Sequence, residues 1–176
     1  VIVIHIARST QLLYCYRNKK RWKNVLRRKK TIAILNGPNL NLLGSREQDI
    51  YGHQTLGEIE AACKEHASAI GYRLDFRQTN SEGQLIDWIQ DLSKVGAIII
   101  NPAAYTHTSI AIRDALISCD CPVIEVHISN VLKREIFRRE SLISDIASGI
   151  ICGFGTYGYI LALNAVDDLL RNGKFI

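Results

Sequence analysis

Five short apolar segments alternate with stretches of helical periodicity, and this alternation restricts the folds open to the chain more than any other feature. The strand-like segments are residues 31–35, 72–77, 97–100, 123–127 and 149–152. The helical stretches are residues 56–70, a stretch that opens at Ser81, and residues 106–118, 133–140 and 156–170. Strands that alternate with helices pair in parallel through right-handed crossovers. The sequence therefore predicts an α/β domain of three layers, in which helices cover a five-stranded parallel sheet.

Two of the helical stretches open with a capping box, in which a hydroxyl residue and a Glu or Gln three positions later satisfy each other's backbone N–H groups. The pairs are Thr55 with Glu58, and Ser81 with Gln84. Gly71 is placed to end the first of these helices. These signals predict where both helices begin and where the first one ends.

Positive charge is concentrated at the N-terminal end of the chain. A net charge of +5 and a pI near 9.0 would indicate a nucleic-acid partner. However, residues 1–30 hold ten basic and no acidic residues, whereas residues 31–176 hold 12 basic and 17 acidic residues. The chain is thus an acidic domain behind a basic segment, and nucleic-acid binding remains an alternative for that segment alone.

The basic segment does not match a targeting signal. Its apolar run at residues 1–6 precedes the charges, whereas a secretory signal places the charges first. Organelle transit peptides are basic and poor in acidic residues, as this segment is, but they are usually rich in serine, and this segment contains only Ser9. The chain has no methionine, and Val1 is its first residue. We expect residues 1–29 to be a disordered or non-native extension.

The five cysteines form no regular framework. None has the C-x-x-C spacing of a zinc or redox site, and Cys119 and Cys121 are separated by one residue. Scattered free thiols are typical of a reducing compartment, which predicts a cytoplasmic location. No apolar run approaches the ~18 residues of a membrane-spanning helix, so we expect no membrane partner.

Polar residues follow the first, third and fourth predicted strands. In a doubly wound sheet, ligands bind beyond the carboxyl ends of the strands. An Asn-rich loop is often only a turn, but three polar loops at one sheet edge favour a binding site. The polar side chains of these loops are Asn39, Asn101, Thr106, His107, Thr108, Ser109, Glu125, His127, Ser129 and Asn130.

Glu125 and His127 lie two positions apart on a predicted strand, so their side chains point to the same face. A carboxylate beside an imidazole orients the ring and in general raises its pKa, which suits a general acid. The alternative is a buried pair that only satisfies itself. The position at the carboxyl end of a central strand favours catalysis.

Two further candidates depend on their surroundings. His107 stands at the start of the predicted helix 106–118, where free N–H groups favour an anion; the alternative is an exposed residue beside a helix cap. Residues 44–52 are bounded by glycines and have the character of a lid. Within them Arg46 can lower the pKa of Tyr51, ordinarily ~10, so that the phenol acts as a base. The alternative is a solvated loop with a packed tyrosine.

The segment from Gly153 to Gly158 matches G-x-G-x-x-G after a strand. A dinucleotide site also requires a later strand with an acidic residue about 20 positions on, and only 18 residues follow Gly158. The pattern therefore favours a tight turn with close packing of helix on strand.

Several loop motifs occur together in a characteristic order and spacing. They are ILNGPNLNLLG at 34–44, SRE at 45–47 with YG at 51–52, QTNSEG at 78–83, NP at 101–102 with YTHTS at 105–109, EVHISN at 125–130, and RE at 134–135 with FRR at 137–139. Over residues 30–170 the chain resembles type II 3-dehydroquinate dehydratase. The resemblance implies a flavodoxin-like three-layer sandwich with strand order 2-1-3-4-5 and a catalytic domain at residues 30–176.

The resemblance also implies a reaction and a set of residue roles. The reaction is the reversible elimination of water from 3-dehydroquinate through an enolate, without metal or cofactor, giving 3-dehydroshikimate in the shikimate pathway. Tyr51 would be the general base, held as phenolate by Arg46, and Asn39 would hold a water that stabilises the enolate oxygen. His127, oriented by Glu125, would protonate the departing hydroxyl. The implied substrate-binding residues are Asn101, His107, Asp114, Ile128, Ser129 and Arg138, with Asp114 reaching the site of a neighbouring subunit.

Two positions depart from the family pattern. Ala103 stands where the family usually has glycine, and Gln48 stands where the lid commonly has proline. We expect both to affect affinity and rate rather than reaction type. The family typically assembles as a dodecamer of four trimers. The alternatives are the same reaction in quinate breakdown and a nucleotide-binding flavodoxin-like module.

Overall fold

The structure, a computed structural model, describes residues 31–45, 53–92 and 95–172. Its centre is a parallel sheet of five strands in the order β2-β1-β3-β4-β5. The strands are β1 (Thr31–Asn36), β2 (Arg73–Gln78), β3 (Ala97–Asn101), β4 (Val123–His127) and β5 (Gly149–Cys152). The predicted strand number, parallel pairing and strand order are confirmed.

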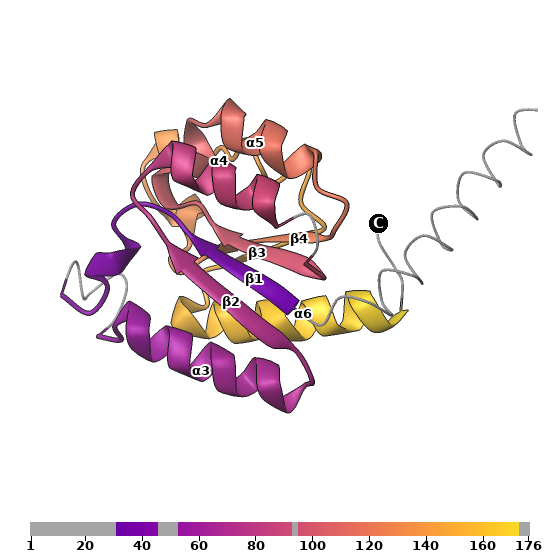
Figure 1. Cartoon of the computed structure of the whole chain (residues 1–176). Helices are drawn as coiled ribbons and strands as arrows, with labels where there is room; N and C mark the ends of the chain where they lie inside the picture. Colours follow the sequence, from indigo (N-terminus) through magenta and orange to yellow (C-terminus); the bar gives the residue numbers. More distant parts are fainter. Residues whose placement is uncertain (1–30, 46–52, 93–94, 173–176) are drawn as a thin grey trace, which may run out of the picture.

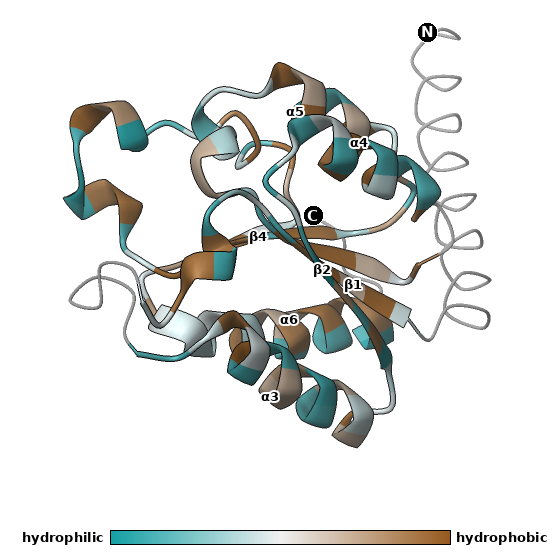
Figure 2. Ribbon diagram, turned by 60° about the vertical axis from the view of Figure 1, so that its left-hand side comes forward, coloured by the Kyte–Doolittle hydropathy of each residue, from teal (hydrophilic) through white to brown (hydrophobic). Residues whose placement is uncertain are grey.

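Four α-helices of the described part cover the sheet on both faces. Helices α3 (Leu56–Ala69) and α6 (Gly158–Asn172) lie on one face, and α4 (Glu82–Asp91) and α5 (Ile110–Ile117) lie on the other (Figure 1). Strands β1 and β4 are largely apolar, whereas the edge strand β2 is largely hydrophilic, as are parts of the helices (Figure 2). The molecule is therefore the predicted three-layer sandwich.

Strand β1 supplies both cores because its side chains alternate between the two faces of the sheet. Ile32 and Ile34 pack in the cluster beneath α3 and α6, whereas Ala33 and Leu35 pack in the cluster beneath α4 and α5. All four side chains are fully buried. A strand buried on both faces explains the continuous apolar run that the sequence shows at this position.

The predicted helix starts are confirmed at α3 and α4. The Thr55 hydroxyl accepts from the backbone N–H of Glu58, whose carboxylate accepts in return from the backbone N–H of Thr55. The Ser81 hydroxyl accepts from the backbone N–H of Gln84. Both helices therefore begin where the capping residues predict.

Two helical predictions were wrong in extent. The helix expected at 106–118 begins only at Ile110, because Ser109 caps it by accepting from Ile112 N, and a 3-10 helix, η2 (Ala103–His107), precedes it. The stretch 133–140 is not one helix but parts of two 3-10 turns, η3 (Val131–Lys133) and η4 (Ile136–Arg138). Arg134 between them is extended, with a ψ of −169°, which breaks the helical path.

Close contact between two loops joins the ends of β1 and β3. The backbone N–H of Gly37 donates to Asn101 O at 2.8 Å. A Cβ at Gly37 would lie 2.4 Å from the carbonyl oxygen of Pro102, closer than real atoms approach. Glycine at this position therefore allows the two polar loops to meet.

Replacement of Gly37 by alanine is expected to destabilise the fold by roughly 1–3 kcal/mol, because backbone must move to admit the methyl group. Gly57→Ala is the matched control, since a Cβ at that α3 position meets nothing within 4 Å. It should stabilise the helix by roughly 0.5–1 kcal/mol. Urea unfolding measures both changes, and equal effects of the two variants would contradict the packing argument.

None of the described helices is long and apolar enough to cross a membrane. Cys63 and Cys152 are free thiols, as predicted, and Cys15 lies outside the described residues.

Candidate active site

A pocket opens at the carboxyl ends of β1, β3 and β4, where the sequence placed the site. Its volume is about 160 Å³. This is below the ~300–1,000 Å³ of drug-sized sites and suits a small metabolite. The lining residues are Pro38, Asn39, Leu40, Leu43, Asn101, Ala103, Ala104, His107, His127, Ile128, Ser129, Val131, Arg134 and Arg138.

His127 and Glu125 form a directly bonded pair at the end of β4. His127 Nε2 lies 2.8 Å from Glu125 Oε1, and the two side chains are 6% and 0% exposed. An ionised carboxylate only accepts hydrogen bonds, so Nε2 must carry the proton of this bond. The other ring nitrogen, Nδ1, is therefore left for the pocket.

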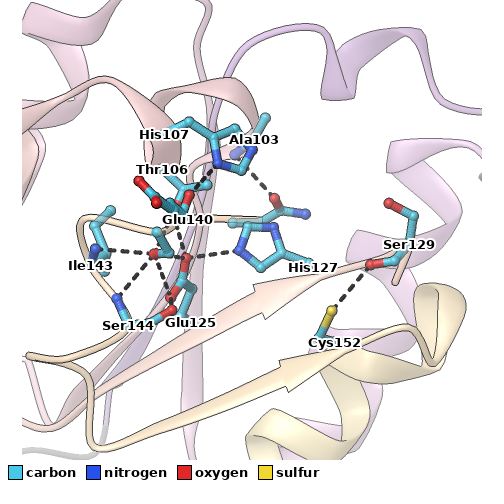
Figure 3. Close-up of polar contacts among 12 residues, drawn as sticks. Ala103, Thr106, His107, Glu125, His127, Ser129, Glu140, Ile143, Ser144 and Cys152 are labelled. Atoms are coloured by element: carbon cyan, nitrogen blue, oxygen red, sulfur yellow. Dashed lines mark hydrogen bonds and ion pairs between the residues drawn. The ribbon is translucent and has the colours of Figure 1, made fainter. Parts of the chain in front are cut away.

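Three hydroxyl groups surround the same carboxylate (Figure 3). Glu125 accepts from Thr106 Oγ1 at 2.5 Å, from Ser141 Oγ at 2.9 Å and from Ser144 Oγ at 2.6 Å. Burial raises the pKa of Glu125, but the hydrogen bond and charge of His127, with the hydrogen bonds of Ser144 and Thr106, outweigh burial and lower the pKa to about 2. Glu125 is thus an ionised carboxylate that is stabilised by hydrogen bonds from protein groups, and it holds His127 in one orientation.

Glu125→Gln is expected to remove a pH-dependent part of the stability. The folded pKa of about 2 lies below the ordinary value of 4.5, so the ionised carboxylate stabilises the fold above pH 4.5 and this contribution disappears as pH falls towards 2. The upper bound is on the order of 3 kcal/mol. Urea unfolding from pH 7 to pH 3 measures the free energy of unfolding. The difference in this free energy between wild type and variant should narrow as the pH falls below 4.5.

Glu65→Gln, on the exposed surface of α3, controls for the exchange of carboxylate for amide. If the difference in the free energy of unfolding between wild type and Glu125→Gln stays constant down to pH 3, Glu125 is not held ionised by its neighbours.

Cationic and imidazole groups form one side of the pocket. Arg138 donates from Nε to Glu135 Oε2 at 3.0 Å and lies over the ring of Phe137 at 5.2 Å. Arg134 Nε is 3.6 Å from the same carboxylate. Two guanidinium groups in one wall favour an anionic ligand.

His107 lies in the pocket wall at the end of η2, and its Nδ1 is 2.6 Å from Glu140 O. The predicted position at a helix N-terminus was wrong, because α5 begins three residues later. The ring instead links η2 to the loop that follows η4.

The loop after β1 presents Asn39 to the pocket in a left-handed conformation, with a φ of 67°. Asparagine adopts this region more readily than most residues. Its backbone N–H donates to Asn80 Oδ1 at 2.9 Å, and Gln78 Nε2 donates to the same oxygen at 3.0 Å. The loop after β2 thereby fixes the loop after β1.

Ala103 also has a positive φ, of 52°, although it is not glycine. This conformation costs an alanine roughly 1–2 kcal/mol. The residue lines the pocket and packs against the core beneath α3 and α6. The β-carbon that the sequence places here is therefore accommodated at the price of backbone strain.

The glycine-rich turn between β5 and α6 uses its amides within the protein. Gly153 N donates to His127 O at 3.1 Å, and Gly155 N donates to Ile128 O at 3.0 Å. A Cβ at Gly158 would lie 3.5 Å from Ile151 Cγ2. The turn thus packs α6 on β5 and supports the end of β4, as the tight-turn interpretation predicted.

The structure brings together most of the side chains that the sequence predicted for the site. Asn39, Asn101, His107, His127, Ile128, Ser129 and Arg138 line the pocket, and Glu125 lies directly behind His127. Asp114 is exposed on α5 and does not line this pocket. Tyr51 and Arg46, with Gln48, lie outside the described residues.

Sequence reasoning missed Ser141 and Ser144, because they belong to a loop that follows no strand. Their spacing of three, with both hydroxyls in one turn, was the available signal. Among residues 31–45, 53–92 and 95–172, no group of three or more His, Cys, Asp or Glu is placed to hold a metal ion.

The family model described as Dehydroquinase class II matches residues 30–167. The chain belongs to the class II dehydroquinases. The resemblance seen in the loop motifs is thereby confirmed over the same part of the chain.

Individual relatives agree with this assignment. The chain is 58% identical over 135 residues to the 3-dehydroquinate dehydratase 2 of Pseudomonas aeruginosa, a match that covers 76% of this chain and 91% of the relative. It is 53% identical over 145 residues to the 3-dehydroquinate dehydratase of Rhizobium meliloti, covering 82% and 98%.

Solved structures of the family share the fold. The type II dehydroquinase of Propionibacterium acnes matches with a TM-score of 0.76 at 43% identity, covering 79% of this chain and 97% of that one. The enzyme of Butyrivibrio crossotus matches with a TM-score of 0.77 at 42% identity, covering 79% and 98%. Class II dehydroquinases are lyases, so the enzyme class predicted from the sequence is confirmed and the nucleotide-binding module is not favoured.

Proposed function

We propose that this chain catalyses the reversible elimination of water from 3-dehydroquinate, giving 3-dehydroshikimate, in the pocket at the ends of β1, β3 and β4. The observation that carries the proposal is the His127–Glu125 pair, which faces a pocket with two guanidinium groups in its wall. The substrate is a carboxylate, which these cations suit.

The elimination needs a base and an acid on different elements. Tyr51, held as phenolate by Arg46, takes the proton at C2, and the electrons of that C–H bond move onto the neighbouring ketone oxygen. Asn39 holds a water that stabilises the enolate oxygen as it forms. When the enolate collapses, the C1–O bond breaks and the doubly protonated ring of His127 gives its Nδ1 proton to the leaving hydroxyl, which departs as water and leaves a neutral ring protonated at Nε2.

Glu125 keeps the acid in position throughout. Its carboxylate accepts the Nε2–H of His127, which leaves only Nδ1 to face the substrate. The three hydroxyls then hold Glu125 itself. The acid is therefore oriented before substrate enters, so no rearrangement is needed in the transition state.

Substrate binding falls to the remaining lining groups. Arg138 binds an oxygen-rich part of the substrate by charge, and His107 and Asn101 bind by hydrogen bonds. Ile128 and Ser129 follow the acid on β4 and bind through backbone and side chain. Asp114 is exposed on α5 and does not line this pocket, which supports a role at the site of a neighbouring subunit in a trimer-based dodecamer.

Residues 30–176 form the catalytic domain in this proposal, and residues 1–29 are an extension that takes no part in the chemistry. The enzyme acts in the cytoplasm and in the shikimate pathway towards aromatic amino acids. Quinate breakdown uses the same elimination, and growth of a strain lacking the enzyme, with and without aromatic amino acids, distinguishes the two roles.

Product absorbance tests the reaction. The product is a conjugated enone, which absorbs in the ultraviolet where 3-dehydroquinate does not. Addition of the full-length chain to 3-dehydroquinate should raise this absorbance until equilibrium is reached, and 3-dehydroshikimate should give the reverse change. Absorbance that stays at the level of the protein-free mixture in both directions would overturn the proposal.

A further inference from the structure

A chain of buried hydrogen bonds runs beneath the pocket from β1 to β3. Asn36 and Asn101 end these neighbouring strands opposite each other in register. Tyr159, on α6, lies between them and is fully buried. Its hydroxyl is 2.6 Å from Asn36 Oδ1 and 2.9 Å from Asn101 Nδ2.

Backbone groups at both ends fix the direction of this chain. The backbone N–H of Ala103 only donates, and it reaches the side chain of Asn101 at 3.2 Å, so the atom there is the oxygen Oδ1. At the other end Arg77 O only accepts, at 3.1 Å, so the Asn36 atom beside it is the nitrogen Nδ2. Neither amide can turn over without breaking a bond to the backbone.

The hydroxyl of Tyr159 completes the sequence of donors and acceptors. It has one proton, which it donates to Asn36 Oδ1, and it therefore accepts from Asn101 Nδ2. Burial raises the pKa of Tyr159 above its usual range, so the hydroxyl keeps that proton. One N–H of the Asn101 side-chain amide thus donates to Tyr159, and the other N–H remains for a ligand.

Of the three side chains in this series of hydrogen bonds, Asn101 lines the pocket, whereas Asn36 and Tyr159 lie behind it. We infer that Tyr159 is a positioning residue, which fixes Asn101 as a hydrogen-bond donor towards an oxygen atom of the substrate. The inference rests on the proposed function, because it assigns the pocket to that substrate.

Tyr159→Phe removes one hydroxyl and leaves Asn101 held only through Ala103 N. We expect KM for 3-dehydroquinate to rise roughly 3- to 10-fold, which corresponds to the loss of one hydrogen bond. The change in kcat should be less than about twofold, since the Tyr159 hydroxyl bonds to Asn36 and Asn101 and not to the acid His127. Kinetics are measured well below the melting temperature of the variant. Tyr157→Phe, an exposed tyrosine in the 3-10 turn directly before the same helix, is the matched control and should change neither constant.

A double-mutant cycle separates positioning from general loosening of the fold. If Tyr159 acts through Asn101, Tyr159→Phe should have no further effect on KM in the Asn101→Ala background. Independent effects that multiply, or a fall in kcat at unchanged KM, would overturn the inference.

Hydrogen exchange of the Asn101 side-chain amide in the wild-type protein gives a test that needs neither turnover nor a variant. By ¹⁵N NMR, the proton bonded to Tyr159 should exchange slowly and its partner rapidly. Two amide protons that exchange equally fast would overturn the assigned orientation, even in an active enzyme. Slow exchange in a protein without dehydratase activity would overturn the proposed function and leave the orientation standing.

Discussion

Replacement of His127 by asparagine should lower kcat by roughly 10³-fold, within the range that a general acid supplies. Hydroxide is a poor leaving group, and the pocket holds His127 in place to protonate it. Asparagine is too short to reach Glu125 as Nε2 does, but Thr106, Ser141 and Ser144 still donate to the buried carboxylate, so the fold should survive. Product absorbance measures the rate, and circular dichroism measures the melting temperature.

His66→Asn makes the same chemical change on α3, at a residue that does not line the pocket and whose ring contacts Asn164. It should leave kcat unchanged. A His127→Asn enzyme that retains more than about a tenth of wild-type kcat would remove His127 from the role of acid, because the expected loss is far larger.

Tyr51→Phe should lower kcat by on the order of 10³-fold or more, because phenylalanine has no group that can remove the C2 proton. KM should change little by comparison, since the base is assigned to the transition state rather than to substrate binding. Single-turnover measurement of enone formation separates the chemical step from product release. Tyr51 lies outside the described residues, so its role rests on the family motif.

Tyr157→Phe controls for the loss of a phenol elsewhere, at an exposed residue directly before α6. Undiminished turnover of Tyr51→Phe would show that Tyr51 is not the base. In that event the pocket would still contain the acid, and another group would have to supply the base.

The arrangement of the sheet was predictable because strand and helix periods differ so clearly in this chain. The run at residues 31–35 has no polar break, which indicates a strand covered on both faces, and β1 is such a strand. The extent of α5 was not predictable from periodicity, because Thr106 and Ser109 are both good caps. Tertiary contacts decide between them, since Thr106 donates its hydroxyl to Glu125 and only Ser109 caps the helix.

The site was predictable to the extent that parallel strands carry their carboxyl ends to one edge. That rule located Asn39, Asn101 and His127 without any knowledge of their contacts. It did not locate Ser141 or Ser144, which reach Glu125 through a loop whose path depends on the tertiary fold.

The role of Tyr159 could not be predicted from the sequence, for a different reason. In sequence it is one aromatic residue among the apolar positions of a helix, where a core role is the natural expectation. Only the positions of Asn36 and Asn101, 123 and 58 residues away, show that its hydroxyl belongs to a polar network.

Deuterium exchange at C2 of 3-dehydroquinate tests most directly whether this pocket divides the elimination between a base and a separate acid. In D₂O, NMR follows loss of the C2 proton signal while absorbance follows the enone, with a protein-free mixture as the reference. We expect His127→Asn to exchange the C2 proton without forming product, and Tyr51→Phe to do neither. Exchange that disappears with His127 but persists without Tyr51 would contradict the division of roles.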